Sequence, residues 1–341
     1  MKLCFKGIAV IALVMVALPA FAGGRRDAAY PSRDITVVVP WGAGGASDLT
    51  VRLLAEQMHR ELGVNMPVIN MGGAGGSIGM NDVFTAPRNG YRILGTSMAS
   101  LVSVGVMDLA PIRFNQWYAW NAAFTPSTIV VRRDSPFQTI DDLIAAMRAG
   151  TVTMGSAGPG SSGHIGGVVF AGGAGVSFTH IPYEGGSPAI IATLGGEVDF
   201  NAQLLSELID HIRSGDLRAL ASLAAEDITI VGAGGQNIVI PSIRHTLPNL
   251  SGMLPVGGSF GIMVPRDTPR EIVDTLSRAY AVAAQSAAFR DFANERGKIV
   301  LGYTTEQTDA YLSTASRVIA WTLADAGLAV VSPTALGIPR P

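Results

Sequence analysis

The chain has 341 residues, with 24 Lys and Arg against 26 Asp and Glu, which leaves a formal net charge of −2. Hydrophobic residues make up 48% and charged residues 15%, a balance that excludes a disordered chain and supplies enough apolar side chains for two compact lobes. Because the charge is slightly negative, a nucleic-acid partner is not expected.

The N-terminal segment, residues 1–22, has the pattern of a cleavable signal peptide. Lys2 and Lys6 precede an apolar run over residues 8–18, and residues 20–22 read Ala-Phe-Ala, the small-x-small pattern of a cleavage site. The run is shorter than the ~20 residues that a membrane-spanning helix needs. We therefore expect cleavage after Ala22 and a soluble periplasmic or extracytoplasmic protein.

Cys4 is the only cysteine, and it lies within this proposed signal peptide. Removal of 22 of the 341 residues would leave about 319 without a thiol, with 22 Lys and Arg against 26 Asp and Glu. For the mature chain this excludes disulfides, thiolate nucleophiles and cysteine-based metal sites.

A first glycine turn, residues 41–48, follows the first predicted strand. Residues 35–39 are an apolar strand, residues 42–45 read Gly-Ala-Gly-Gly, and apolar residues at helical spacing begin at Leu49. The turn therefore lies at a helix N-terminus, where unpaired N–H groups and about half a positive charge favour an anion. Glycine also lets a ligand approach the backbone closely.

Three further glycine turns follow predicted strands in the same way. We call them the second, third and fourth glycine turns, and they cover residues 72–77, 155–164 and 182–188. Two of the four turns precede residue 128 and two follow it. This distribution predicts two lobes that face each other across a cleft.

Strands and helices alternate from Tyr30 to about residue 97, which is typical of a mostly parallel sheet covered by helices. The aromatic-rich residues 98–126 have no clear period, and both packing between the lobes and an aromatic ligand cage remain open. A strand at Thr128 enters the second lobe.

Residues 226–258 contain glycine or proline in every apolar run, so we predict a return crossing with an extended loop. Capping signals at Thr139, Thr268 and Thr304 start three helices. The resulting division is a signal peptide at 1–22, lobe 1 at 30–127 plus 259–333, lobe 2 at 128–222, and a hinge with return crossing and extended loop at 223–258.

Three enzyme or cofactor patterns fit poorly. A dinucleotide fingerprint would place glycine at Ser47 and an acidic residue at Asn70, and no lysine follows any glycine turn as a P-loop requires. Two G-x-S-x-G matches, around Ser77 and Ser259, lack the sharp strand-to-helix elbow of a serine hydrolase. The five histidines form no metal-binding pair, so neither a metal nor a cofactor is expected.

Some side chains of the turns allow more than one role. His164 could donate to an anion or tie down its turn, and Trp41 and Tyr183 could wall a cavity or lie in the core. For Asp48, capping of the turn is favoured over ligand contact, because a carboxylate repels an anion.

None of the four turns contains Arg or Lys. Neutral donors can still suffice, because hydrogen bonds to a charged group contribute ~1.5–3 kcal/mol each and micromolar binding needs about 8 kcal/mol. This favours reversible capture of a carboxylate over catalysis.

The sequence resembles the receptors of tripartite tricarboxylate transporters, also called Bug proteins, over nearly the whole mature chain. The resemblance is carried by short motifs in both halves: Tyr-Pro-Ser at 30–32, Val-Pro-aromatic-x-x-Gly-Gly with Asp48, Gly-Ala-Gly-Gly at 73–76, Gly-Tyr at 90–91, Gly-Ser-Ala-Gly at 155–158 with Ser161, Ser162 and His164, Pro-Tyr-Glu-Gly-Gly at 182–186, Leu-Gly-Gly-Glu-Val-Asp at 194–199, and Leu-Arg-Ala-Leu-Ala at 217–221.

The resemblance implies an α/β, two-lobed periplasmic-binding-protein-like fold, with two doubly wound sheets joined by a hinge and a cleft between them. It implies a receptor without catalytic activity that closes on a small carboxylate and delivers it to membrane transporter subunits; we expect a monomer. The ligand-binding residues that it implies are Trp41, Ala43, Gly44, Ser47, Asp48, Gly75, Gly76, Ser97, Ser156, Ala157, Ser161, Ser162, His164, Tyr183, Gly185 and Asn201.

Departures from the family pattern bear on the ligand. Glu184 stands where a basic residue is common, Met71-Gly72 stand where arginine and proline are common, and residues 226–245 are longer than usual. An acid at 184 disfavours a second ligand carboxylate and could pair with an amino group. A secreted serine hydrolase using Ser77 and a sensor-only binding protein are the alternatives.

Overall fold

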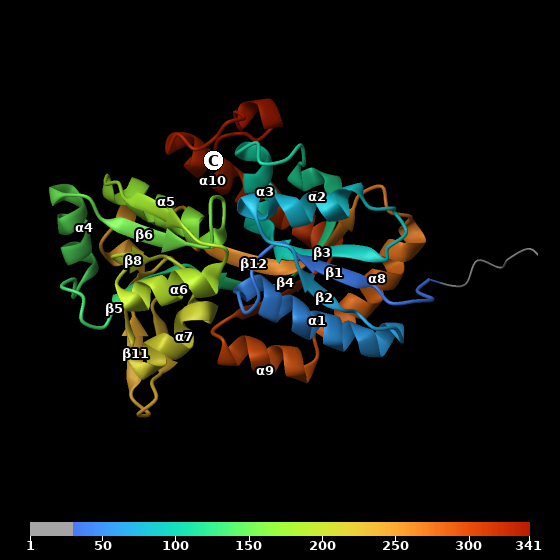
Figure 1. The fold of residues 1–341 in the computed structure, drawn as a ribbon, viewed down its shortest axis with the longest axis horizontal. Coiled ribbons are helices and arrows are strands. Elements are labelled where there is room, and N and C mark those ends of the chain that lie inside the picture. The colour runs from blue at the N-terminus through green and yellow to red at the C-terminus, as the bar shows by residue number, and fades with distance from the viewer. Residues whose placement is uncertain (1–29) are drawn as a thin grey trace, which may run out of the picture.

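The computed structural model describes residues 30–341, so the proposed signal peptide and its cleavage site lie outside the described residues. Two α/β lobes lie side by side, and each is built around its own sheet (Figure 1). The predicted fold, a two-lobed α/β protein, is confirmed. Within residues 30–341 no helix combines the length and apolarity needed to cross a membrane.

Lobe 1 contains a six-stranded sheet in the order β13-β4-β12-β3-β1-β2. Its strands β1, β2 and β3 are parallel, whereas β12 and β4 are antiparallel to their neighbours, so the mostly parallel sheet that the alternation predicts holds for only half of it. The bounds are β1 (Thr36–Val39), β2 (Val68–Asn70), β3 (Arg92–Ser97), β4 (Trp117–Pro126), β12 (Gly257–Pro265) and β13 (Ile299–Tyr303).

Helices cover both faces of this sheet. Helix α8 packs on α1, while α10 contacts α3 and β4 and also reaches α5 (Ser162–Ala174) of lobe 2. The helices are α1 (Ala46–Leu62), α2 (Ser77–Thr85), α3 (Met98–Val106), α8 (Arg270–Ala284), α9 (Ala287–Glu295) and α10 (Thr305–Asp325), with short 3-10 turns η1 (Ala74–Gly76), η2 (Phe114–Gln116) and η5 (Thr334–Leu336).

Lobe 2 contains a five-stranded sheet in the order β7-β6-β8-β5-β9, in which β7, β6 and β8 are parallel and β5 is antiparallel to both of its neighbours. Its elements are β5 (Thr128–Arg132), α4 (Ile140–Ala149), β6 (Thr153–Ser156), α5 (Ser162–Ala174), β7 (Thr179–Pro182), α6 (Gly186–Gly195), β8 (Phe200–Asn201), α7 (Leu205–Ser214) and β9 (Leu217–Ser222).

The aromatic-rich residues 98–126 form α3 and β4. Trp117 and Trp120 are buried in the hydrophobic cores on the two faces of the lobe 1 sheet, and the indole N–H of Trp120 donates to Ser277 Oγ at 3.0 Å. These two rings therefore stabilise lobe 1 and do not line an aromatic cage.

The chain crosses between the lobes at two adjacent places. Strand β4 continues into β5 through Ser127, and the return path enters β12 after Val256. Backbone hydrogen bonds join the two crossings, since Ser127 N donates to Val256 O at 3.0 Å and Leu223 N donates to Ser127 O at 2.8 Å. A paired crossing of this kind is suited to act as a hinge.

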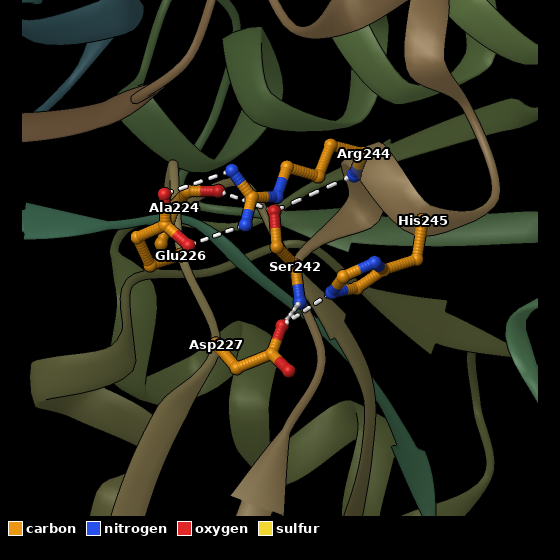
Figure 2. A network of polar contacts seen from close by, with 6 residues as sticks. All are labelled: Ala224, Glu226, Asp227, Ser242, Arg244 and His245. Atoms are coloured by element: carbon orange, nitrogen blue, oxygen red, sulfur yellow. Dashed lines mark hydrogen bonds and ion pairs between the residues drawn. The ribbon is translucent and has the colours of Figure 1, made fainter.

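The segment before the return crossing is more ordered than the extended loop that its glycines and prolines suggest. It contains an antiparallel hairpin of β10 (Ile228–Val231) and β11 (Asn237–Ile240), followed by η3 (Ile243–His245) and η4 (Pro248–Leu250). Figure 2 shows how polar contacts close the base of the hairpin. Asp227 accepts from Ser242 N at 2.8 Å and pairs with His245 Nε2 at 2.7 Å, while Arg244 pairs with Glu226.

Candidate functional site

The four glycine turns follow β1, β2, β6 and β7, and they meet across the cleft in two pairs. In the pair formed by the first and fourth turns, a Cβ added at Gly42 would lie 2.6 Å from the carbonyl oxygen of Glu184. In the pair formed by the second and third turns, a Cβ added at Gly75 would lie 2.9 Å from the carbonyl oxygen of Pro159. Glycine is therefore required where backbone from one lobe touches backbone from the other.

A small cavity of about 40 Å³, here called the interlobe cavity, lies between these turns. Both lobes contribute to its wall, and serine hydroxyls are prominent in it. The lining residues are Trp41, Gly42, Gly45, Ala46, Ser47, Ser97, Ser100, Ala157, Ser161, Ser162, Gly163, Gly186, Gln203, Leu204, Glu207 and Phe260.

A larger hollow of about 600 Å³, here called the cleft mouth, shares Trp41 and Ala157 with the interlobe cavity. Residues of the second, third and fourth turns surround it, among them Gly75, Gly76 and Tyr183. Glu184 also lines the cleft mouth and is exposed. The interlobe cavity and the cleft mouth thus form adjoining parts of one cleft.

Three of the expected first-lobe residues line the interlobe cavity: Trp41, Ser47 and Ser97. The indole N–H of Trp41 donates to Thr96 Oγ1 at 2.9 Å, which fixes the ring between the two hollows. Ser97 caps α3 by accepting from Ser100 N at 3.1 Å. The side chains of Trp41 and Ser97 are thus held in place by hydrogen bonds within lobe 1.

Three expected second-lobe residues face them: Ala157, Ser161 and Ser162. Ser161 caps α5 by accepting from His164 N at 3.2 Å. Ser162 Oγ donates across the cleft to Ser97 Oγ at 3.3 Å. The hydroxyls of the two lobes are therefore close enough to share one small ligand.

The remaining expected residues of the first turn have other surroundings. Asp48 accepts from Gly44 N at 2.9 Å and from Asn70 Nδ2 at 2.9 Å, and it pairs with Arg52 at 2.9 Å. Burial alone would raise the pKa of Asp48, but these hydrogen bonds and the charge of Arg52 lower it overall. Asp48 therefore braces the turn, while Ala43 and Gly44 are exposed.

The remaining second-lobe residues support the third and fourth turns from behind. The ring of His164 accepts from Gly160 N at 3.2 Å and stacks on His180, with 4.1 Å between ring centroids. Burial, aided by His180, lowers the pKa of His164 to about 3, so the ring is neutral and ties down its turn. Ser156 contacts His180 Nε2 at 2.7 Å, Asn201 is buried and pairs in the sheet with Gly155 of the third turn, and Gly185 packs on Gly42.

Sequence reasoning missed Gln203 and Glu207, which bring an amide and a carboxylate into the interlobe cavity. Glu207 Oε1 accepts from Ala46 N at 2.8 Å, at the N-terminus of α1 in the other lobe. Glu207 lies in the first turn of α7, where an acidic residue is common because it interacts favourably with the helix dipole. In the sequence, this local role gives no sign that Glu207 also lies in the cleft. No pattern in the sequence links it to α1.

Ser77, the candidate nucleophile of the hydrolase alternative, begins α2. Within residues 30–341 no hydrogen bond joins Ser77 to a histidine, and no group of three or more His, Cys, Asp or Glu side chains could hold a metal ion. In the described part of the chain, Ser77 therefore lacks the hydrogen-bonded histidine that activates the nucleophile of a serine hydrolase.

Comparison with known proteins agrees with this architecture. A family model described as "Tripartite tricarboxylate transporter family receptor" matches residues 50–318. A UPF0065 protein from the TAR-I ttuE-ttuC′ intergenic region of Agrobacterium vitis is 33% identical over 270 residues, covering 74% of this chain and 72% of the relative. BugT of Bordetella pertussis is 28% identical over 314 residues, covering 88% and 91%.

Solved structures of the same fold include the periplasmic binding protein BugD, with a TM-score of 0.79 and 27% identity over 88% of this chain and 99% of that one. A TctC solute-binding protein from Polaromonas has a TM-score of 0.62 and 27% identity over 87% and 99%. The chain belongs to the TctC, or Bug, family of solute receptors of tripartite tricarboxylate transporters.

Proposed function

We propose that this receptor binds a small carboxylate in the interlobe cavity and closes around it by rotation at the Ser127 and Val256 crossings. One observation carries the proposal: the four glycine turns meet in cross-lobe pairs around a cavity lined by serine hydroxyls from both lobes. Hydroxyl and backbone N–H groups are donors for a carboxylate, and helix N-termini supply favourable partial charge.

The cavity lining contains no Arg or Lys, so neutral donors provide the binding free energy. Hydrogen bonds to a charged group contribute ~1.5–3 kcal/mol each, so several of them reach the about 8 kcal/mol of micromolar binding. Among proteins of similar fold, MatC of Rhodopseudomonas palustris holds malate and a second R. palustris protein holds adipate. Both ligands are small carboxylates.

Within this proposal the expected residues have two kinds of role. The ligand contacts lie in the interlobe cavity and at the cleft mouth, namely Trp41, Ser47, Ser97, Ala157, Ser161 and Ser162, then Gly75, Gly76 and Tyr183. The supporting residues shape the turns, namely Ala43, Gly44, Asp48, Ser156, His164, Gly185 and Asn201.

The cellular part of the proposal follows from the family and the N-terminal sequence. Residues 1–22 direct export and are cleaved, residues 30–127 plus 259–333 move as lobe 1, and residues 128–222 move as lobe 2. The monomeric receptor then delivers its carboxylate to the membrane subunits of a tripartite transporter and performs no catalysis.

Thermal-shift screening of the purified mature protein against small carboxylic acids tests the proposal. A ligand at 100 times its dissociation constant stabilises the folded state by ~2.7 kcal/mol, which raises the melting temperature measurably. Reaction of Ser77 with an acylating probe would instead favour the hydrolase. A melting curve unchanged by every acid would refute carboxylate binding.

A further inference from the structure

Glu207 has an unusual environment for a carboxylate in a binding cleft. The residue keeps partial exposure because it lines the interlobe cavity, while protein encloses its carboxyl group. It accepts two hydrogen bonds, from Ala46 N at 2.8 Å and from Gln203 Nε2 at 3.0 Å. The backbone N–H of Leu204 also favours the ionised form of Glu207. A carboxylate offers about four acceptor positions, so at least one remains free.

No ion pair satisfies this charge. Among residues 30–341, no Lys, Arg or His nitrogen lies within 4.0 Å of the Glu207 carboxylate. The cation whose charge acts on Glu207 is Lys298, which is buried, donates to Thr50 Oγ1 at 2.9 Å and lies 4.9 Å from the ring centroid of Phe260. Burial lowers the pKa of Lys298 to about 7, so near neutral pH its charge is incomplete. Burial likewise raises the pKa of Glu207, and the hydrogen bond from Ala46 N and the charge of Lys298 offset this only in part, so a ligand cation beside Glu207 would favour its ionised form.

Gln203 adds a second acceptor without a partner. Gln203 is 2% exposed, and its buried Oε1 atom has no hydrogen bond. The bond from Nε2 to Glu207 assigns the amide orientation when Glu207 is ionised, because a carboxylate can only accept. Oε1 therefore faces Gly163, another residue of the interlobe cavity. Enclosed charges and polar atoms are normally paired, so this corner of the cavity lacks a cationic donor.

We propose that Glu207 and Gln203 form an acceptor subsite for a ligand ammonium group, so that the receptor selects carboxylates that also carry an amino group. This inference rests on the proposed function, because the ligand carboxylate still binds the serine- and amide-lined part of the cleft. An ammonium has three donors, which match the free positions on Glu207 and Gln203 Oε1. A second carboxylate in the same corner would be repelled by Glu207.

The sequence suggested Glu184 as the partner of an amino group, whereas the structure favours Glu207. Glu184 is exposed at the cleft mouth, where water and salt weaken its interaction with a ligand charge. Glu207 is enclosed and belongs to the cavity where the two lobes meet, so its interaction with a cation is screened less. The two carboxylates thus make a matched pair of test positions.

The test compares amino acids with their des-amino analogues on the full mature receptor. Thermal shift is used to screen the proteinogenic amino acids and the carboxylic acids that lack only the amino group, such as L-glutamate with glutarate and L-aspartate with succinate. Compounds that raise the melting temperature are then titrated calorimetrically. We expect the amino-bearing member to bind about 10- to 100-fold more tightly, as one or two charge-assisted hydrogen bonds provide. Glu207→Gln should abolish this preference, and Glu184→Gln should keep it.

Calorimetry in two buffers of different ionisation enthalpy gives an independent readout that needs no variant. A bound ammonium favours the ionised form of Glu207 and the neutral form of Lys298, so protons are released; a bound second carboxylate would cause proton uptake. Tight binding of plain acids without an amino preference would overturn this inference and leave the proposed function intact. Binding of neither class would overturn both.

Discussion

Gly42→Ala should block closure of the lobes while leaving each lobe folded. A Cβ at this position would lie 2.6 Å from the carbonyl oxygen of Glu184, whereas ordinary contacts begin at 3.4 Å, so the two turns must separate by about 0.8 Å. Both groups are backbone-anchored, so no side chain can rotate away. Overpacking of this kind costs ~1–3 kcal/mol, and here it destabilises only the closed state.

A closed state destabilised by that amount lowers the affinity for a ligand that binds between the lobes by about 5- to 150-fold. The assay is calorimetric titration of wild type and variant with a carboxylate identified by thermal shift, together with the melting temperature of the free protein. Gly44 is unsuitable for this test because its φ of 79° would strain any residue that carries a Cβ, including alanine. Gly42 has no positive φ, so alanine there tests the contact alone.

Gly150→Ala is the matched control. Gly150 has an extended φ of −169° and no atom within 4 Å of an added Cβ, so alanine there should leave the affinity unchanged. If Gly42→Ala binds as tightly as wild type, the contact between the first and fourth turns does not form in the bound state, and the closure argument is wrong.

Three further predictions concern stability. Trp41→Phe leaves the buried Thr96 Oγ1 without its donor, so urea denaturation should show a loss of ~1–3 kcal/mol in unfolding free energy. Because the pKa of Asp48 is lowered in the folded state, its contribution to the free energy of unfolding is present above the unfolded pKa of ~3.9 and is lost as pH falls through the folded pKa. Asp48→Asn should remove this loss of stability at acidic pH. A variant with the same dependence of stability on pH as wild type would contradict the prediction. Lys298 has a folded pKa of about 7 and an unfolded pKa of ~10.5, so between these values it binds more protons in the unfolded chain. The free energy of unfolding should therefore rise with pH in this range, by up to ~1.4 kcal/mol per pH unit. Lys298→Met should flatten that slope, which denaturation at several pH values measures.

Local patterns in the sequence predicted much of the fold, because strands, caps and turns depend on residues close together in the chain. The four strand-turn-helix units are present at the predicted places, and the capping boxes at Thr139 and Thr304 are confirmed. The box at Thr268 is wrong, since α8 begins at Arg270 with Pro269 as its N-cap and no side-chain cap. Strand β4 was missed because its aromatic-rich run has no clear period, and the hairpin of β10 and β11 was missed because glycine and proline interrupt the apolar runs there. The antiparallel orientation of β4 and β12 depends on strand pairing between residues far apart in the chain.

Contacts between distant residues were decided only by the tertiary structure. The Ala46 and Glu207 pair is separated by 161 positions, and the contact of Gly42 with Glu184 likewise joins two lobes. The sequence by itself determined that the chain has anion-favouring helix N-termini after its strands, because glycine content and helical spacing are local properties. Which turns face each other, and that an acceptor pair stands between them, depends on how two sheets pack about a hinge, and no short-range pattern encodes that arrangement.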